Sequence, residues 1–266
     1  MLKKLLIIFF ISLSFVLFIY ACLIEPNKLD ITNYSIKDDE LAGIKIVFAT
    51  DLHVKKHQTK KIQELVELIN SYNPDLVLSS GDFVAGHTKL STMSVDKIAT
   101  LLGKIKSKYG FYTCLGNHDD WHDREFITSE FAKNGITVLH NENTKVNIKG
   151  KDVYIAGIQY KIKDIALIDK TLENTSSPII MLTHSPDEFV KMPNNINLVL
   201  AGHTHGGQIK LPFVGAIFTA SKYKDKYLNG YIEENGKRMI VSRGLGVSIL
   251  PLRFNCKPEL VIIEFI

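Results

Sequence analysis

Residues 44–53 read IKIVFATDLH, a short apolar run rich in β-branched side chains that ends directly in Asp51 and His53. Such a run is typical of a buried strand. After it, the apolar residues recur with the period of one helix face, at Ile62, Leu65, Val66 and Ile69. Asn73-Pro74 ends this helix, and residues 76–78 form the next apolar run. A strand, a helix and a further strand in this order favour a largely parallel sheet.

The same alternation continues along the chain. Ser94 can cap a second helix, residues 111–115 read as a third strand, and a third helix is expected near residues 123–133. The second half favours two hairpins, 144–148 with 153–158 and 227–232 with 239–242, and further strands at 179–182, 198–200 and 260–265. We therefore predict an α/β domain over residues 44–266, with two mixed β-sheets packed face to face and flanked by helices.

Composition excludes several classes of protein. The chain has 266 residues, of which 45% are hydrophobic and 23% charged, so disorder, collagen and coiled coil are excluded. A formal net charge of +4 is too small to indicate nucleic acid as a partner. The cysteines are too few and too scattered for a disulfide framework. We expect the protein to act as a monomer.

The first 24 residues contain the membrane-scale segment of the chain. Residues 5–24 carry no charge and match the roughly 20 residues that an α-helix needs to cross a bilayer. We interpret residues 1–24 as a retained single-pass anchor; a cleaved signal peptide and lipidation of Cys22 are the alternatives. Lys3 and Lys4 precede the run, which predicts a cytoplasmic N-terminus and an extracytoplasmic domain, with a cytoplasmic domain as the other possibility. The polar residues 25–43 read as a linker.

Aspartate, asparagine or histidine residues, which can bind metal ions, follow each of the expected parallel strands. They are Asp51 and His53, then Asp82, then Asn117, His118 and Asp119, then His184, then His203 and His205. Alone, an Asp-x-His pair or a Gly-Asp turn means little. Open α/β sheets, however, place their ligand sites at the carboxyl ends of strands, so these groups can meet at one edge. Carboxylate, amide and imidazole without thiolate suit Mn²⁺, Fe or Zn²⁺.

Together these blocks resemble the calcineurin-like metallophosphoesterase superfamily, whose pattern is D-x-H, G-D, G-N-H-D/E, H and G-H-x-H in this order. The five blocks lie between Asp51 and His205, so the resemblance covers the whole domain after the linker, and it implies two divalent metal ions. One would be held by Asp51, His53, Asp82 and His205, and the other by Asp82, Asn117, His184 and His203, with Asp82 as the bridge. A hydroxide between the two metals would then attack a phosphodiester or pyrophosphate bond in line.

The resemblance also assigns roles beside the metals. His118, next to the ligand Asn117, would protonate the leaving oxygen or stabilise its charge, and Asp119 would orient its imidazole. Gln208 and Arg243 are candidate substrate contacts from their motif positions, although Arg243 could equally form a structural salt bridge. The apolar residues 211–218, followed by three lysines, could contact lipid or pack on their own domain.

The segments 205–208 and 243–246, with later Pro-Leu-Arg-Phe and Pro-Glu motifs, resemble a branch of membrane-tethered bacterial phosphodiesterases. Some members of it hydrolyse UDP-diacylglucosamine in lipid A synthesis. The sequence thus predicts a membrane-anchored phosphoesterase acting on a lipid or nucleotide-sugar precursor. Two alternatives remain: a broad phosphodiesterase or phosphatase on soluble substrates, and a tethered scaffold without activity. The second is disfavoured because every expected ligand is present.

Overall fold

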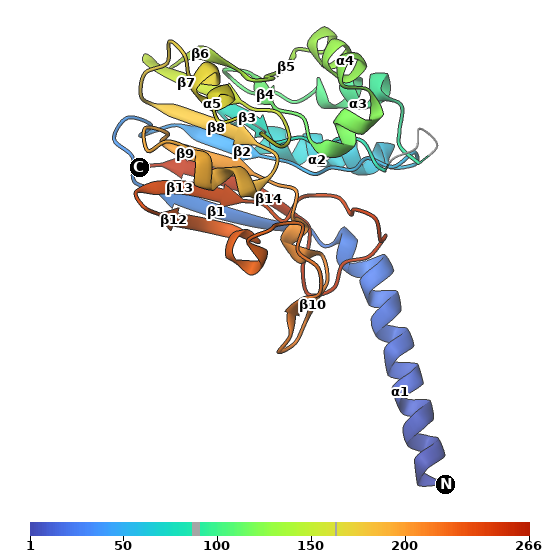
Figure 1. Cartoon of the computed structure of the whole chain (residues 1–266). Helices are drawn as coiled ribbons and strands as arrows, with labels where there is room; N and C mark the ends of the chain where they lie inside the picture. Colours follow the sequence, from blue (N-terminus) through green and yellow to red (C-terminus); the bar gives the residue numbers. More distant parts are fainter. Residues whose placement is uncertain (87–90, 163) are drawn as a thin grey trace.

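Two six-stranded β-sheets form the centre of the molecule, as the computed structural model shows for residues 1–86, 91–162 and 164–266 (Figure 1). The first sheet has the order β1 (Asp30–Ile36), β14 (Glu259–Phe265), β2 (Lys45–Phe48), β3 (Leu76–Ser79), β4 (Phe111–Thr113), β5 (Ile136–Val138). The second has the order β12 (Gly230–Glu234), β13 (Lys237–Val241), β9 (Leu198–Ala201), β8 (Ile179–Thr183), β7 (Lys151–Gly157), β6 (Glu142–Ile148). The predicted α/β class with two mixed sheets is confirmed.

Both sheets are parallel at their centres. β2, β3, β4 and β5 pair in parallel in the first sheet, as do β13, β9, β8 and β7 in the second, while β14–β2, β12–β13 and β6–β7 are antiparallel. Alternate side chains of each central strand face opposite layers, as the period of a strand requires. Ile46 and Phe48 of β2 therefore meet Leu198 and Leu200 of β9 in the core between the sheets.

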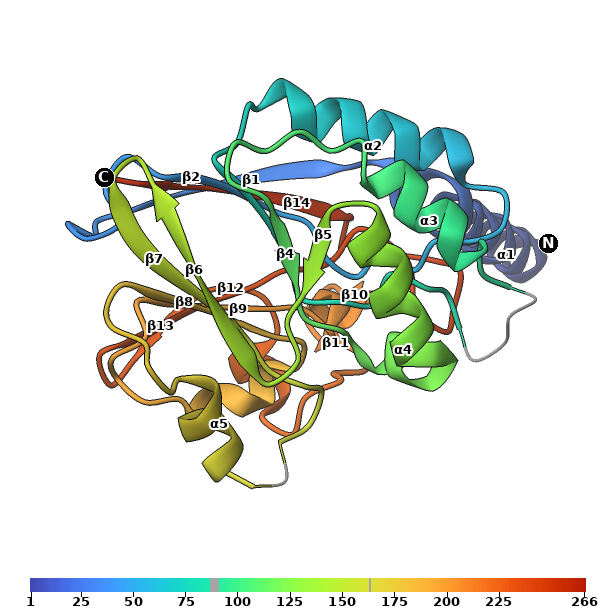
Figure 2. The ribbon, with the colours of Figure 1, turned by 90° about the horizontal axis from the view of Figure 1, so that it is seen from above.

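Helices cover the two outer faces, which gives four layers (Figure 2). On the first sheet lie α2 (Thr59–Ser71), α3 (Val95–Leu102) and α4 (Asn117–Lys133), and their apolar faces pack on Val47 and Val77. The second sheet is covered by α5 (Ala166–Thr171) and by the short turns η3 (Pro186–Lys191) and η5 (Lys224–Tyr227). A small hairpin of β10 (Lys210–Leu211) and β11 (Gly215–Ala216) projects from this body.

The N-terminal segment is helical and mostly exposed. The helix α1 (Leu2–Ile19) continues through η1 (Tyr20–Ile24) and η2 (Glu25–Asn27), and Leu2–Asn27 is long and apolar enough to cross a membrane. Its N-terminal part extends away from the domain, whereas Ala21, Glu25 and Pro26 at its end are buried.

The interpretation of residues 25–43 as a linker was wrong for most of that segment. Residues 30–36 form the edge strand β1, which pairs in parallel with the last strand from Asp30–Glu259 to Ile36–Phe265. After it, the side chain of Asp38 accepts backbone N–H groups of Glu40 and Leu41 and pairs with Arg238. The folded domain therefore begins directly after the apolar helix, with no flexible spacer among residues 30–41.

A few element bounds also differ from the expected ones. α4 begins at Asn117, six residues before the expected start near 123, and its backbone is non-helical at Asp123. The short strand β5 was not predicted, because only three residues contribute to it. The expected hairpin around Asn235-Gly236 is confirmed, as is the strand at the C-terminal end.

Candidate metal centre

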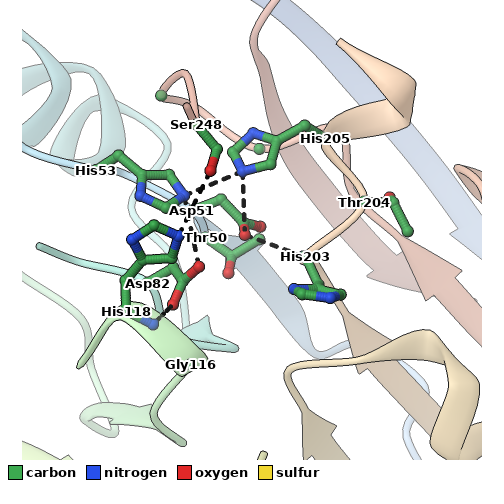
Figure 3. A network of polar contacts seen from close by, with 12 residues as sticks. Thr50, Asp51, His53, Asp82, Gly116, His118, His203, Thr204, His205 and Ser248 are labelled. Atoms are coloured by element: carbon green, nitrogen blue, oxygen red, sulfur yellow. Dashed lines mark hydrogen bonds and ion pairs between the residues drawn. The ribbon is translucent and has the colours of Figure 1, made fainter. Parts of the chain in front are cut away.

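The loops after five strands meet at one edge of the two sheets, and they carry all seven expected ligands. Asp51 and His53 follow β2, Asp82 follows β3, and Asn117 begins α4 after β4. From the second sheet come His184 after β8, and His203 and His205 after β9. Figure 3 shows side chains of both sheets facing a common centre. The convergence follows from the parallel strands, whose carboxyl ends share one edge.

The first group of donor atoms joins the two sheets. Nε2 of His53 lies 3.0 Å from Nε2 of His205 and 3.5 Å from Oδ2 of Asp82. Oδ1 of Asp51 lies 3.8 Å from Nε2 of His205. Asp51, His53 and His205 are all buried and can hold one cation between them.

The second group lies on the other side of Asp82. Nε2 of His184 is 3.2 Å from Oδ2 of Asp82, 3.1 Å from Oδ1 of Asn117 and 3.1 Å from Nδ1 of His203. The other nitrogen of His184, Nδ1, faces the carbonyl of Ser80 at 2.8 Å, which directs Nε2 at the centre. His53 is oriented in the same manner by the carbonyl of Val84, at 3.2 Å from its Nδ1. Such carbonyl partners are typical of metal-binding histidines.

Asp82 is the residue that the two groups share. Its Oδ2 is the atom close to both His53 and His184, while its Oδ1 accepts the backbone N–H of His118 at 2.9 Å. One oxygen thus fixes the carboxylate, and the other points between the two groups. This is the arrangement that a bridging ligand requires.

The donor set fits divalent cations. Two ligands of one metal at about 2.1 Å and at right angles are separated by about 3.0 Å, close to the contacts of His53 with His205 and of His184 with its neighbours. Nε2 of His184 has three such neighbours at once, but a single ring nitrogen offers only one proton or one lone pair to them. Oδ2 of Asp51 is buried without a hydrogen-bond partner among the described residues, and a cation would satisfy it.

Protonation in the site reflects this crowding of buried groups. Burial lowers the pKa of His53 to about 4 and that of His203 to about 3, so both imidazoles are neutral and able to ligate at pH 7. Burial also raises the pKa of Asp51 to about 7. Burial disfavours the charged form of His184 too, but the Asp82 carboxylate outweighs it and raises the pKa of His184 to about 9. The buried carboxylate of Asp82 thus stabilises a proton on the neighbouring imidazole of His184.

The backbone beneath the ligands is strained. Asp51, His53, Asp82, His203 and His205 all have φ between 42° and 71°, in the left-handed region that L-residues avoid. Each such residue costs on the order of 1–3 kcal/mol, and clusters of them are found at functional sites. The glycines in the motifs serve close packing instead: a Cβ on Gly116 would lie 2.1 Å from Oδ1 of Asp82, and one on Gly202 would lie 2.1 Å from Oδ2 of Asp51.

His118 lies beside the metal-binding groups, at the wall of the site. Its ring packs edge-on against that of His53, with centroids 4.6 Å apart, and its Nε2 is 3.5 Å from Oγ of Ser248. The side chain also lines the adjoining cavity, where a leaving group would lie. This position agrees with the expected role of a proton donor.

Asp119 has a different set of partners from the expected one. Its two carboxylate oxygens accept the backbone N–H groups of Asp82 at 2.7 Å, Phe83 at 2.9 Å, Val84 at 3.2 Å and Gly116 at 3.1 Å. The expected contact with the imidazole of His118 is not among these four hydrogen bonds. These contacts instead assign Asp119 to the support of Asp82, because they fix the loop that carries this side chain.

The two candidate substrate contacts are placed differently. Gln208 lines the cavity, but its amide donates to the carbonyls of Ser248 and Leu250 and accepts from the N–H of Ser248, so it holds that loop. Arg243 does not line the cavity; its guanidinium pairs with Glu259 at 2.9 Å and with Asp30 at 3.5 Å. For Arg243 the structure supports the alternative of a structural salt bridge.

Sequence reasoning missed a buried cation behind the site. The Arg253 side chain is fully buried and donates to the carbonyls of Arg243, Gly244, Gly246 and Cys256, while Nη2 lies 3.3 Å from Nδ1 of His205. A single arginine thereby holds together the loop after β13 and the ligand His205. The only signal was its place in the Pro-Leu-Arg-Phe motif, which does not reveal such contacts. Tyr160, whose hydroxyl is 3.4 Å from Nε2 of His203, was also missed.

A cavity of about 490 Å³ opens over the metal-binding groups. Its floor is formed by Asp82, Asn117, His203 and His205, with His118 at the side. The rest of the wall is largely apolar, being made by Trp121, Tyr160, Ile209, Phe218, Ile249 and Leu250. The space therefore combines a polar floor with walls suited to an apolar group.

The two-sheet fold and the carboxylate, amide and imidazole groups that meet at Asp82 define a metal-dependent phosphoesterase. A family model described as calcineurin-like phosphoesterase matches residues 44–207, and the chain belongs to this family. It is accordingly a hydrolase that acts on phosphoester bonds.

Several relatives are similar over most of this chain. The uncharacterized metallophosphoesterase YkuE of Bacillus subtilis is 32% identical, over 91% of this chain and 87% of that protein. The phosphodiesterase YaeI of Escherichia coli is 28% identical, over 91% of this chain and 90% of that protein. A transmembrane protein with metallophosphoesterase domain of Danio rerio is 28% identical, over 84% of this chain and 53% of that protein.

Proposed function

We propose that this protein is a membrane-anchored phosphodiesterase that uses two divalent metal ions. The observation that carries the proposal is the position of Oδ2 of Asp82, 3.5 Å from Nε2 of His53 and 3.2 Å from Nε2 of His184. A carboxylate oxygen between two imidazole groups suits a pair of cations better than a single one. The donor types suit Mn²⁺, Fe or Zn²⁺.

When bound, such a pair of ions supplies a water nucleophile at neutral pH and neutralises the oxygens of the phosphoryl group. The chain supplies the remaining parts. Asp51, Asn117 and the four histidine ligands hold the ions, and Asp82 sets the spacing of the two sites. His118 donates a proton to the leaving oxygen from the side of the cavity, a contribution of about 10²- to 10⁴-fold to the rate. Asp119 keeps Asp82 in place through the backbone.

The substrate class follows from the shape of the cavity. A phosphodiester or pyrophosphate needs room on both sides of the phosphorus, and the volume of about 490 Å³ extends beyond the metal-binding floor. The apolar wall of Trp121, Phe218, Ile249 and Leu250 favours a substrate with an apolar portion. A lipid-linked phosphoester or a nucleotide-sugar precursor such as UDP-diacylglucosamine has this character. The similarity to a phosphodiesterase of Escherichia coli supports a diester over a monoester.

Anchoring by the N-terminal helix is the second part of the proposal. Leu2–Asn27 is long and apolar enough to cross a membrane, and the large apolar side chains of its N-terminal part are exposed. The transmembrane relative of Danio rerio adds support. Lys3 and Lys4 favour a cytoplasmic N-terminus, which would place the catalytic domain on the extracytoplasmic side.

The experiment is a substrate panel on the full-length protein in detergent, stripped of metal and reconstituted with Mn²⁺, Fe²⁺ or Zn²⁺. We expect metal-dependent hydrolysis of bis-nitrophenyl phosphate, slower hydrolysis of the nitrophenyl monoester, and the highest turnover with a UDP-linked acyl sugar. Equal and low turnover of all three would favour the broad phosphodiesterase. Absence of metal-dependent hydrolysis of any of them would contradict the proposed function.

A further inference from the structure

The end of the apolar helix is built into the catalytic domain. The carbonyl of Ala21 accepts the backbone N–H of Arg253, and the carboxylate of Glu25 accepts that of Cys256. The carbonyl of Pro26 accepts Nζ of Lys61 at 3.1 Å. Because Ala21 and Glu25 are buried, with 5% and 1% of their surface exposed, the helix leaves the domain in a fixed direction. Its orientation therefore fixes that of the domain.

A second apolar element projects on the same side of the domain. The hairpin of β10 and β11 extends from the body in the direction in which α1 runs toward its N-terminus (Figure 1). Its exposed large apolar side chains are Leu211, Phe213, Val214, Ile217 and Phe218. Ile249 and Leu250, in the loop held by Gln208, are exposed as well. The surfaces of soluble proteins rarely present so many neighbouring apolar side chains.

The hairpin and the loop of Ile249 belong to one unit. Ile209 forms a bridge with Phe254, and the N–H of Lys210 donates to the carbonyl of Phe254 at 2.8 Å. The same segment carries Arg253, whose N–H contacts Ala21 at the end of the helix. The hairpin is thus coupled to the anchor through only a few residues, and its direction relative to α1 is fixed.

We propose that the hairpin 209–218, with Ile249 and Leu250, is a second membrane contact that inserts its apolar side chains into the bilayer surface crossed by α1. The 18 residues of α1 span about 27 Å, nearly the hydrocarbon thickness of a bilayer, so a domain docked on residues 21–26 must lie at the bilayer surface. A hairpin that projects along α1 then reaches the lipid. Exposed aromatic and aliphatic side chains at such a position are stabilised in the headgroup and acyl boundary.

The contact would also orient the active site. Phe218, Ile249 and Leu250 belong both to the exposed apolar surface and to the wall of the cavity. The mouth of the cavity would therefore border the bilayer, and a lipid-linked phosphoester could reach the metal-binding floor without leaving the membrane. This consequence for the substrate rests on the proposed phosphodiesterase activity, whereas the membrane contact itself rests only on the proposed anchoring by α1.

The test is the depth of single tryptophans in the full-length protein reconstituted into phosphatidylcholine and phosphatidylglycerol vesicles. The native Trp121 is replaced by Phe, and a tryptophan is introduced by Phe213→Trp or, separately, by Val214→Trp, both at exposed positions of the hairpin. The matched control is Ile165→Trp, an exposed apolar position at the start of α5. Acyl chains brominated near the headgroup quench a tryptophan that has entered the bilayer.

We expect brominated lipid to reduce the emission of both hairpin variants by about twofold or more, as for an interfacial side chain, and to leave Ile165→Trp unchanged. Iodide in the aqueous phase should show the reverse order. If both hairpin tryptophans are as accessible to iodide as Ile165→Trp, the proposed contact is wrong. A blue-shifted emission without quenching by bromine would indicate a protein partner and would equally overturn it. Hydrolysis of bis-nitrophenyl phosphate by the wild-type protein, which keeps Trp121 and is reconstituted into the same vesicles, tests the phosphodiesterase activity separately.

Discussion

Nε2 of His53 and Nε2 of His205 lie 3.0 Å apart, although the two residues are 152 positions apart in the sequence and belong to different sheets. Both nitrogens belong to buried imidazoles whose pKa is lowered by burial, so both rings are neutral and able to ligate at pH 7. They match the edge of a coordination polyhedron with metal bonds of about 2.1 Å. The fold therefore places donor atoms from the two sheets close together. Hydrogen bonds between the loops of the two sheets hold this arrangement, for example from the N–H of His203 to Oδ1 of Asp51 at 2.9 Å.

The first prediction concerns His118. His118→Ala should leave the metal content unchanged, because the expected ligands of both groups remain, and should lower kcat by about 10²- to 10⁴-fold through the loss of a proton donor. Metal analysis and steady-state kinetics on a nitrophenyl diester measure both quantities. The control is His57→Ala, at an exposed position outside the site. Full activity of His118→Ala would remove this residue from the mechanism.

The second prediction concerns the glycine beneath Asp51. In Gly202→Ala the new Cβ would lie 2.1 Å from Oδ2 of Asp51, so the carboxylate has to move away from its site. We expect the variant to bind less metal and to lose most of its activity. Gly150→Ala provides the contrast, because the new Cβ meets open space and the variant costs only the strain of a positive φ, about 1–2 kcal/mol. Equal metal content in the two variants would show that the close packing at Gly202 has no functional role.

The third prediction separates a structural from a substrate-binding role for Arg243. Its partner Glu259 is buried, so Arg243→Ala should destabilise the fold by about 3 kcal/mol and leave KM nearly unchanged. Urea denaturation and kinetics give the two values. Arg124→Ala removes an exposed pair with Asp120 and should cost less than about 1 kcal/mol. A large rise in KM with unchanged stability would assign Arg243 to the substrate instead.

The fourth prediction is a pH dependence of stability that arises far from the metal centre. Burial alone would raise the pKa of Asp75, but hydrogen bonds from Lys149 and from the N–H of Lys45 hold it below its ordinary value. The unfolded chain therefore binds this proton more readily than the folded chain does. The stabilisation is complete at neutral pH, above the pKa in the unfolded chain, and is lost as the pH falls through the lower pKa in the folded state.

Asp75→Asn tests this effect, because the amide cannot take up the same charge. The difference in unfolding free energy between wild type and variant should be clear at pH 7 and should shrink toward pH 3. Measuring Asp152→Asn in parallel controls for an exposed aspartate, whose pair with Lys145 lies in solvent. A difference for Asp75→Asn that is constant with pH would show that its charge does not stabilise the fold.

The convergence of the expected ligand residues could be predicted from the sequence because each of them follows an apolar run directly. In residues 44–53 the strand is followed directly by Asp51 and His53. Because neighbouring strands run in parallel, the residues that follow them lie at the same edge of the sheet. Asp119 shows the limit of this reasoning. Its place beside His118 suggested a contact with the imidazole, but its carboxylate accepts three backbone N–H groups of the loop after β3, besides that of nearby Gly116. Such contacts depend on the folded backbone, which local sequence does not encode.

The segment after the apolar helix shows the same limit at the level of the fold. Residues 30–36 read DITNYSI, a mostly polar stretch that looks like a linker, yet they pair with residues 259–265 near the end of the chain. An edge strand with one face in solvent needs few apolar residues, so its composition resembles that of a loop. The burial of Arg253 could not be foreseen either, because its partners are carbonyl groups of a loop that exists only in the folded state.

The central claim is that Asp82 joins two cation sites. The most direct measurement is an anomalous difference map from crystals of the protein soaked in Mn²⁺, for wild type and for Asp82→Asn. The account predicts two peaks in the wild type about 3.5–4 Å apart, both within bonding distance of Oδ2 of Asp82. In the variant both should lose most of their occupancy. A single peak, or two peaks that remain at full occupancy in Asp82→Asn, would contradict the account.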